Sequence, residues 1–363
     1  MPRAAVRILH PEPDAGAGEL TRLVATARGL AAQELARRFA DLGADDVRVE
    51  RGPADGRSFG ERLRALAGEA SIETGIVVLG SGSIPLAGDA ALRALLNTAA
   101  SGERRALTNN RYSSDVVAMG DTSLLADLPD LPSDNALPRW LERQGVVVDE
   151  LPDRARLGID IDSPLDLELL RRHPDCPKPL ATLARSMAHR LARPAEALDE
   201  LATLARNPRK QLLVTGRLSA ATLQDLERRA ASRVRALVEE RGLRTAAADQ
   251  QPPASALGLL LDRDGPDEIG MLVDRLADGA VIDTRVLLAH RHGADERGWP
   301  PPEDRFASDL LLADRVRDPW LQRLTLHAWS HSVPIALGGH TLVGPGLALA
   351  LGLDPGLDPG VGP

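Results

Sequence analysis

The sequence predicts an α/β protein with two domains, and three observations indicate this fold class. The 363 residues are enough for two domains of ordinary size, each with a core of its own. Short apolar runs alternate with longer segments in which apolar residues recur at helical spacing, as strands and helices alternate in α/β domains. A proline-rich segment, HPDCPKP, starts at His173 and separates the two halves. We expect a first domain over residues 1–172, a linker over 173–180, a second α/β or α+β domain over 181–352 and a flexible tail over 353–363.

The first half alternates expected strands with expected helices. The segment Ile76 to Leu79 is apolar throughout, which is typical of a strand buried on both faces. The segment Leu20 to Leu42 has helical periodicity, and Gly43 stands where a C-terminal cap belongs. The expected elements are, in order, a strand at 6–9, a loop at 10–18, a helix at 20–42, a strand at 47–49, a helix at 59–67, a strand at 76–79, a helix at 89–99, a strand at 116–119, a helix at 135–144 and a strand at 146–148.

The second half also mixes the two periodicities, so we expect it to be α/β or α+β. The AAADQQPPAS stretch is a loop because prolines and small polar residues dominate it. The expected elements are helices over about 179–206, a strand at 212–214, a helix at 220–241, a strand at 257–261, a helix at 267–276, a strand at 281–289, one or two helices over 304–331 and a strand at 333–337.

The composition excludes several classes of protein. A net charge of −8 argues against a general nucleic-acid binder, which would need a basic face to neutralise phosphates. The single Cys176 excludes an intramolecular disulfide and a zinc site built from cysteines. No apolar run of about 20 residues would span a bilayer, and the first residues lack the apolar core of a signal peptide. We therefore expect a cytoplasmic protein without nucleic-acid or membrane partners.

The segment GIDIDSPLDLELLR, from Gly158 to Arg171, is the most informative motif. Asp160 and Asp162 alternate with isoleucines, so a strand would place both carboxylates on one face. Ser163 is a candidate N-cap of the helix that follows, with Pro164 as its first residue and Asp166 completing a start that resembles a capping box. Helix capping does not explain Asp160.

Three polar segments are expected to meet at one edge of the first sheet. They are the loop Gly80 to Leu86, the polar stretch at 108–115 and the aspartates at 160 and 162. In open α/β sheets, ligands bind beyond the carboxyl ends of the strands. Mg²⁺ prefers oxygen ligands and commonly takes one or two carboxylates. We expect Asp160 and Asp162 to bind Mg²⁺, with Asp115 as a third candidate.

Read in order, VVLGSGSIPL, LTNNRYSSDVVAM, SDNALPRWLERQGV and GIDIDSPLDLELL resemble the nucleotidyltransferases of the glycosyltransferase-A type fold. The likeness is to the molybdenum-cofactor and phospholactate guanylyltransferases, and it covers about residues 4–172. It implies a nucleotidyltransferase-like, Rossmann-type, three-layer domain. The implied enzyme uses Mg²⁺ to transfer a nucleoside monophosphate from a nucleoside triphosphate (NTP) to a small phosphorylated or carboxylated acceptor.

The resemblance also implies roles for individual residues. Ser81, Gly82 and Ser83 would bind phosphate through backbone amides, and Thr108, Asn109 and Asn110 would lie near the nucleotide or the acceptor. Arg111 would act in catalysis as a cation. The simpler interpretations are a tight turn for the serines, turn formation for the asparagines and a solvated loop position for Arg111.

Two departures from the family pattern leave a second hypothesis open. The family opens with a Gly-rich loop that carries Arg and Lys, whereas the segment His10 to Gly18 has neither. Ser81 and Ser83 stand where an aspartate normally binds the ion, and Ser163 replaces a threonine. The alternative is therefore a non-catalytic nucleotide- or partner-binding descendant of the fold.

A third hypothesis places the active site in the second half, around Asp283–Asp309. This segment holds the densest polar cluster of that half: Asp283, Arg285, His290, His292, Glu303, Asp304, Arg305 and Asp309. The HAWSH stretch lacks the glutamate of a zinc protease, and neither a Walker loop nor a Gly-x-Ser-x-Gly elbow occurs. The nucleotide base, the acceptor and the existence of a homodimer stay open at this level.

Overall fold

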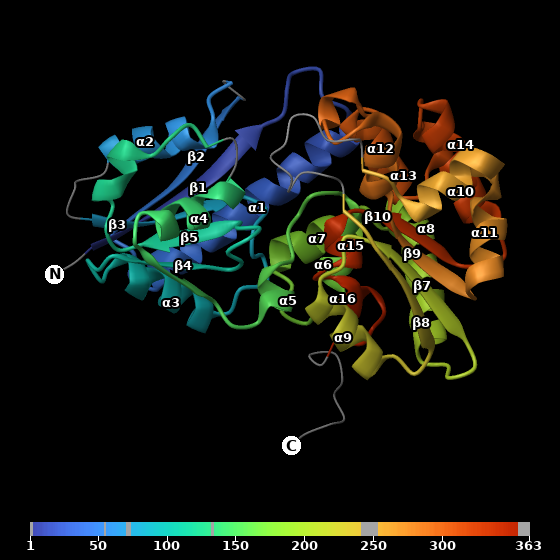
Figure 1. Ribbon diagram of the computed structural model, residues 1–363. Coiled ribbons are helices and arrows are strands. Elements are labelled where there is room, and N and C mark those ends of the chain that lie inside the picture. Colours follow the sequence, from blue (N-terminus) through green and yellow to red (C-terminus); the bar gives the residue numbers. More distant parts are fainter. Residues whose placement is uncertain (1–2, 54–55, 70–73, 132–133, 241–252, 355–363) are drawn as a thin grey trace. The chain divides into compact units, whose positions relative to one another are not determined.

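The computed structural model describes residues 3–53, 56–69, 74–131, 134–240 and 253–354 and is an α/β structure with two sheets (Figure 1). The chain divides into two compact units. The N-terminal unit comprises Met1–Ala17 and Ala25–Ile161, and the C-terminal unit comprises Gly18–Val24 and Asp162–Pro363. The division falls after Ile161 instead of at residue 172, and a helix that starts at Lys178 occupies part of the expected linker. Within these ranges, no helix has both the length and the apolar character needed to cross a bilayer.

The N-terminal unit is built on a mixed six-stranded sheet with the order β2-β1-β3-β5-β4-β6. Strand β5 runs antiparallel to β3 and β4, and the other neighbouring pairs are parallel. The strands are β1 (Arg3–Glu12), β2 (Asp46–Pro53), β3 (Thr74–Gly80), β4 (Arg105–Thr108), β5 (Val116–Met119) and β6 (Val147–Glu150). The helices are α1 (Glu19–Asp41, whose first residues belong to the C-terminal unit), α2 (Phe59–Glu69), α3 (Asp89–Ala99), α4 (Leu137–Arg143) and α5 (Arg154–Leu157).

Strand β3 is buried on both faces, as its apolar sequence predicts. Val77 and Leu79 belong to a core that includes side chains of α1 and α3. Ile76 and Val78 alternate with them and belong to a second core with side chains of α2 and α4. Because successive residues of a strand point to opposite faces, the uninterrupted apolar run supports helices on both sides of the sheet.

The C-terminal unit contains a four-stranded parallel sheet with the order β10-β9-β7-β8. The strands are β7 (Gln211–Gly216), β8 (Arg233–Val238), β9 (Gly279–Asp283) and β10 (Ile335–Gly338). The helices are α6 (Leu165–Arg171), α7 (Lys178–Ser186), α8 (Ala188–Ala205), α9 (Ala220–Arg229), α10 (Ala256–Asp264), α11 (Ile269–Leu276), α12 (Thr284–His292), α13 (Pro302–Asp309), α14 (Pro319–Ser330), α15 (His340–Val343) and α16 (Leu347–Ala350).

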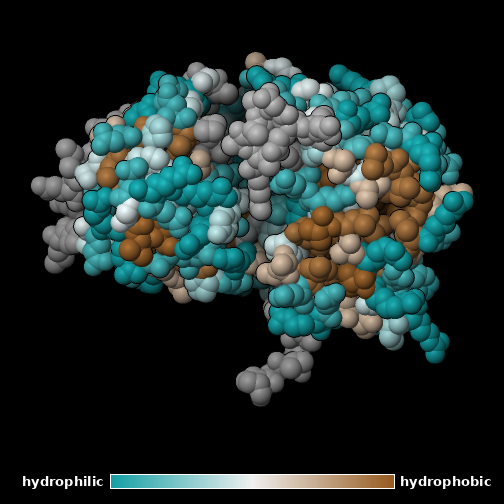
Figure 2. Space-filling view, in the orientation of Figure 1, coloured by the Kyte–Doolittle hydropathy of each residue, from teal (hydrophilic) through white to brown (hydrophobic). Residues whose placement is uncertain are grey.

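The space-filling view shows hydrophobic residues gathered on the visible face of the C-terminal unit (Figure 2). Large apolar side chains of this unit that are exposed include Val238, Leu259 and Met271. Strand β8 lies at the edge of the sheet and carries exposed Arg233 and Arg235. Charged residues on an edge strand oppose edge-to-edge pairing, so the edge itself does not favour a dimer.

Most expected elements of the first half are confirmed, and the differences include strands β1 and β4. Strand β1 continues through His10 to Glu12, where a loop was expected, because its pairing with β2 extends to that point. Strand β4 was not predicted, because its four residues, RALT, carry too short a pattern to separate from the polar segment that follows.

Three expectations for the second half are wrong, each at a short apolar run. The helix expected at 220–241 ends at Arg229, and β8 follows it. The strand expected at 257–261 is helix α10, which begins where the Ser255 hydroxyl accepts the Gly258 N–H at 3.1 Å. The strand expected at 281–289 ends at Asp283, whose carboxylate caps α12 by accepting the Arg285 N–H. Periodicity cannot distinguish buried strands from short buried helices; caps decided the last two cases, and pairing with β7 decided the first.

Candidate functional site

A cavity of about 210 Å³ lies in the N-terminal unit at the carboxyl ends of β1 and β3. The antiparallel β5 starts at the same edge, because Val116 pairs with Leu79. Six polar or charged side chains line the cavity, namely Arg28, Ser81, Ser83, Ser114, Asp115 and Asp160, although the three serines are themselves almost fully buried. Apolar lining residues include Leu9, Phe59, Val78, Val117 and Leu137. The loop after β3, Asp115 and Asp160 therefore meet at this edge of the sheet, as the sequence predicted.

The turn after β3 is held tightly against its neighbours. The Ser81 N–H donates to the Leu9 carbonyl at 2.9 Å, and the Ser83 N–H donates to the Gly80 carbonyl at 3.2 Å. A Cβ atom on Gly82 would lie 2.6 Å from Asp160 Oδ1 and 3.1 Å from the Ile161 carbonyl oxygen, so a side chain there would displace the aspartate. Glycine is therefore needed at position 82 for Asp160 to reach the turn.

Ile84 shows backbone strain in the same turn. Its φ is +45°, although it is β-branched and fully buried. Such a conformation costs on the order of 1–3 kcal/mol and persists only where the surrounding structure enforces it. Strained residues of this kind concentrate at binding and catalytic sites, so Ile84 supports a functional role for the Gly80–Leu86 loop.

Asp160 reaches the cavity through backbone pairing with this turn. Ser83 and Asp160 form an isolated antiparallel bridge, and the Ile161 N–H donates to the Gly82 carbonyl at 3.2 Å. Asp160 is half-buried, and its Oδ1 accepts the Ile161 N–H at 2.7 Å. Arg28 Nε donates to the Ile161 carbonyl at 2.6 Å. The structure thus brings together Asp160 and the cation of α1, which no sequence motif indicated.

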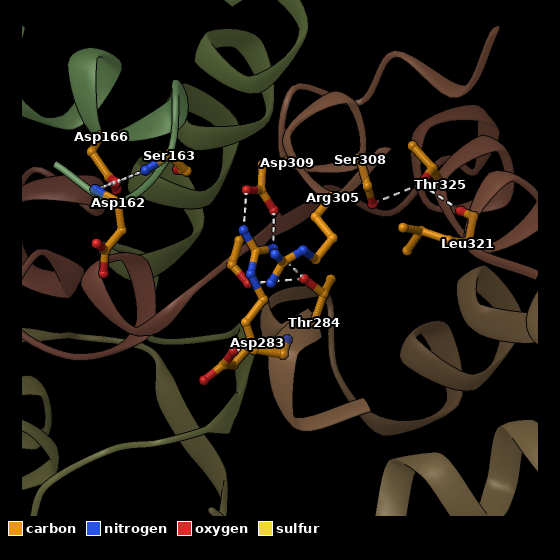
Figure 3. Close-up of polar contacts among 12 residues, drawn as sticks. Asp162, Ser163, Asp166, Asp283, Thr284, Arg305, Ser308, Asp309, Leu321 and Thr325 are labelled. Carbon is orange, nitrogen blue, oxygen red and sulfur yellow. Dashed lines mark hydrogen bonds and ion pairs between the residues drawn. The ribbon is translucent and has the colours of Figure 1, made fainter. Parts of the chain in front are cut away.

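Asp162 has different surroundings and belongs to the C-terminal unit. Its side chain is exposed, and Figure 3 shows the carboxylate pointing away from Asp166. The N–H groups of Asp162 and Ser163 donate to Asp166 Oδ2 at 2.8 and 2.6 Å, which is one half of the expected capping box. The Ser163 side chain does not cap α6, which starts at Leu165. Of the two expected metal ligands, Asp160 lines the cavity and Asp162 does not.

Asn109 positions Asp115 at the cavity. Asn109 Nδ2 donates to Asp115 Oδ2 at 2.7 Å and to the Leu157 carbonyl at 3.0 Å. The Asp115 N–H in turn donates to Asn109 Oδ1 at 3.0 Å. Asn109 is buried and is not part of the cavity lining, so it acts through the carboxylate beside it.

Three further residues of the polar segment, Thr108, Asn110 and Arg111, lie outside the cavity lining. Thr108 is buried, and its hydroxyl lies 2.9 Å from that of Ser114. Asn110 Oδ1 accepts the Tyr112 N–H at 2.9 Å in a local turn. Arg111 donates to the Val148 carbonyl at 2.8 Å and pairs with Glu142 at 3.1 Å. The sequence predicted the right segment, but structural hydrogen bonds and an ion pair account for these three residues.

His10 adds a group that the sequence did not single out. Its Nδ1 lies 3.0 Å from the Ser81 hydroxyl, and both residues are buried. Burial, together with the charge of Arg51, lowers the pKa of His10. A neutral imidazole therefore fixes the orientation of the Ser81 hydroxyl at the cavity wall.

The donor set fits a metal ion that arrives with a ligand better than a resident one. Within the described residues, no group of three or more His, Cys, Asp or Glu side chains is arranged to hold a metal ion. Asp115 and Asp160 nevertheless line one cavity. Two carboxylates suffice for Mg²⁺ when water and phosphate oxygens complete the octahedron.

The polar cluster expected around Asp283–Asp309 does not form a single site. Glu303 accepts the N–H groups of Leu20 and Thr21 at 3.0 and 3.1 Å and so caps α1, while Asp304 accepts those of Arg317 and Asp318. His290 receives the Ser255 N–H at 3.1 Å. Asp309 forms a bidentate pair with Arg285, with both contacts at 2.6 Å. Figure 3 shows these bonds as dashed lines at Asp309. Most of the cluster has a structural role.

We expect His340, which follows β10, to make the folded protein less stable in acid. Burial and the charge of Arg217 lower its pKa from 6.5 to about 4, against the opposing charges of Asp283 and Asp162. Between these two pH values the unfolded chain binds a proton that the folded chain does not, so stability rises with pH. We expect about 3 kcal/mol of unfolding free energy to be lost as the pH falls through this window.

Chemical denaturation at several pH values measures this effect. His340→Gln should flatten the slope of unfolding free energy against pH, whereas His189→Gln, at an exposed position, should not. An unchanged slope in the His340 variant would contradict the assignment.

No model of a known protein family matches this chain, and a search of curated proteins found no similar sequence.

Proposed function

We propose that the N-terminal unit binds an NTP with Mg²⁺ and transfers its nucleoside monophosphate to a small phosphorylated or carboxylated acceptor. One observation carries this proposal. Two carboxylates, Asp115 and Asp160, line the same cavity as the cation Arg28 and the Ser81–Ser83 turn. Charged and polar groups that converge in a mostly preformed pocket are the usual signature of a ligand site.

The charges suit a polyphosphate accompanied by a divalent ion. Asp115 and Asp160 are the residues that would hold Mg²⁺. When bound, the ion offsets the negative charge that develops on the α-phosphate and on the leaving pyrophosphate. Arg28 would supply a fixed cation for the same charge, the role first expected of Arg111 as a replacement for the missing loop cation. The Gly82 N–H remains as a further donor for phosphate, because the N–H groups of Gly80, Ser81 and Ser83 already bond to carbonyls of the protein.

The size of the cavity limits what it encloses. Its volume of about 210 Å³ is below the roughly 300–1,000 Å³ of pockets that surround a drug-sized ligand. Phosphate groups and part of the nucleoside fit this volume, so the acceptor must approach from outside. In the transfer, an oxygen of the ionised phosphate or carboxylate acceptor attacks the α-phosphorus, the bond to the bridging oxygen breaks and pyrophosphate leaves.

A non-catalytic binding module is the second candidate, and two features favour it. Serines occupy positions 81 and 83, where the resembled family has a metal-binding acid, and strand β1 takes up His10–Glu12, where that family has a cationic loop. Both features would weaken turnover more than binding, because charge stabilisation matters most in the transition state.

Two measurements on the full chain separate the candidates. Calorimetric titration with each of the four NTPs, with and without Mg²⁺, tests binding. Release of pyrophosphate in the presence of a pool of phosphorylated and carboxylated acceptors tests transfer. We expect Mg²⁺-dependent binding of at least one NTP and pyrophosphate release that depends on acceptor. Binding without release would favour the module, and an absence of NTP binding would refute both candidates.

Asp160→Asn tests the site itself. We expect it to weaken Mg²⁺–NTP binding by about 10- to 100-fold, because it removes a carboxylate charge at the cavity but keeps the shape of the side chain. Asp162→Asn is the matched control, two residues away on an exposed side chain, and should keep the affinity within about twofold. Equal losses in both variants would instead support the aspartate pair that the sequence predicted, and no loss in either would refute the metal assignment.

A further inference from the structure

We propose that the C-terminal unit has a binding site for the oxyanion group, carboxylate or phosphate, of a small molecule, held by Arg217 at the carboxyl edge of its parallel sheet. This inference goes beyond the function proposed for the N-terminal unit and does not depend on it.

The topology of the sheet identifies the position. From β7 the chain first adds β8 on one side and then β9 and β10 on the other, so the strand order reverses between β7 and β9. Crevices at such switch points are where open α/β sheets bind ligands. Arg217 directly follows β7, and Asp283 is the last residue of β9, so these two side chains stand at the switch point.

Asp283 fixes the guanidinium of Arg217. Arg217 Nε and Nη2 donate to the carboxylate of Asp283 at 2.6 and 3.1 Å. The carboxylate also accepts the Arg285 N–H at 3.0 Å and is fully buried. Burial raises the pKa of Asp283, but the charge and hydrogen bonds of Arg217 outweigh it and leave the pKa below its usual value. An ionised carboxylate therefore holds the arginine in one orientation, which is the arrangement that prepares a side chain for binding.

Arg217 still has donors to offer. Its Nη1 makes no hydrogen bond with any residue that the structure describes, and 18 % of its side chain is exposed. Guanidinium groups match the planar geometry of carboxylates and phosphates, so these donors suit an oxyanion. The Arg285–Asp309 pair of the same unit differs, because both of its guanidinium Nη atoms bond to a carboxylate that is not exposed at all.

His340 provides an independent observation at the same edge. It follows Gly338 and Gly339 at the end of β10, and it lies close enough to Arg217 and Asp283 for both charges to act on it. Its Nδ1 is buried and has no hydrogen-bond partner among the residues described. Buried polar atoms are nearly always paired, so this one indicates a missing partner.

Titration of the full chain with inorganic phosphate and with acetate, followed by thermal stability, tests the proposal. We expect saturable stabilisation by at least one anion, and the preferred anion identifies the source of the oxyanion. Arg217→Gln should weaken that binding at least 10-fold. Arg228→Gln removes an exposed arginine from α9 of the same unit and should leave the binding unchanged.

Two further variants cover the remaining outcomes. Arg217→Lys keeps the charge but cannot donate to Asp283 and to the anion in the same geometry, so it should weaken binding about fivefold even if the Gln variant does not fold. Asp115→Asn acts on the N-terminal cavity and should not change this binding. Three results would each overturn the proposal. They are the absence of saturable binding of both anions, anion binding by the Arg217 variants as tight as that of the native chain, and a loss of anion binding in the Asp115 variant alone.

Discussion

Replacing Asp309 with alanine is expected to destabilise the C-terminal unit by roughly 3–5 kcal/mol. Asp309 is fully buried, and both of its oxygens accept hydrogen bonds from Arg285 at 2.6 Å. Burial lowers the pKa of Arg285, but the charge of Asp309 outweighs burial and leaves the pKa above its usual value. Arginine keeps its charge at ordinary pH, so the variant buries a cation without its bidentate partner.

Urea denaturation of the full chain, followed by tryptophan fluorescence, measures the loss, since Trp299 and Trp320 lie in the same unit. The double variant Arg285→Met with Asp309→Leu should recover most of the stability, because apolar replacement of a whole buried pair is often neutral. Asp295→Ala breaks a surface pair with Arg297 and should leave the midpoint unchanged. A single variant as stable as the native chain would show that the pair is not structurally important.

The sequence predicted those parts of the candidate site that follow from local patterns. The apolar run before Gly80 indicated a buried strand, and the polar loop after it had to lie at the carboxyl edge, which is where Ser81 and Ser83 are found. Asp160 stood out because helix capping does not require it, and it lines the same cavity. The carboxyl-edge rule was sufficient for these positions.

Residues that act through long-range contacts could not be predicted. Arg28 lies within the regular pattern of a helix, and only the fold brings it to the Ile161 carbonyl. His10 pairs with Ser81 across 71 positions of the chain, and Arg217 pairs with Asp283 across 66. Such contacts leave no periodic signal in a single sequence. Conversely, the pairing of Asp160 with Asp162 rested on strand alternation, but only an isolated bridge forms at Asp160.

The same limit explains the elements that were misassigned. Arg233–Val238 and Leu257–Leu261 are short apolar segments next to helical patterns, and periodicity alone does not decide between strand and helix in five or six residues. Strand β8 owes its conformation to pairing with β7, which is a tertiary contact. Helix α10 owes its start to Ser255, which the pattern of apolar residues ignores.

Gly216→Ala is expected to destabilise the C-terminal unit by roughly 3–5 kcal/mol, for two reasons that add. The φ of Gly216 is +128°, a conformation that is close to unique to glycine. In addition, a Cβ atom there would lie 2.2 Å from the Cβ of Asp283, which is buried at the switch point and cannot move aside. The substitution would therefore separate the ends of β7 and β9, where Arg217 and Asp283 meet.

Gly43→Ala is the matched control, because Gly43 also has a positive φ of +96° but has open space around its missing Cβ. It should cost only the free energy of placing alanine at a positive φ, on the order of 1–2 kcal/mol. Denaturation curves of both variants separate the steric contribution from the conformational one. If the two variants lose equal stability, the close approach of β7 to Asp283 does not constrain this edge, and the fixed orientation of Arg217 loses its structural cause.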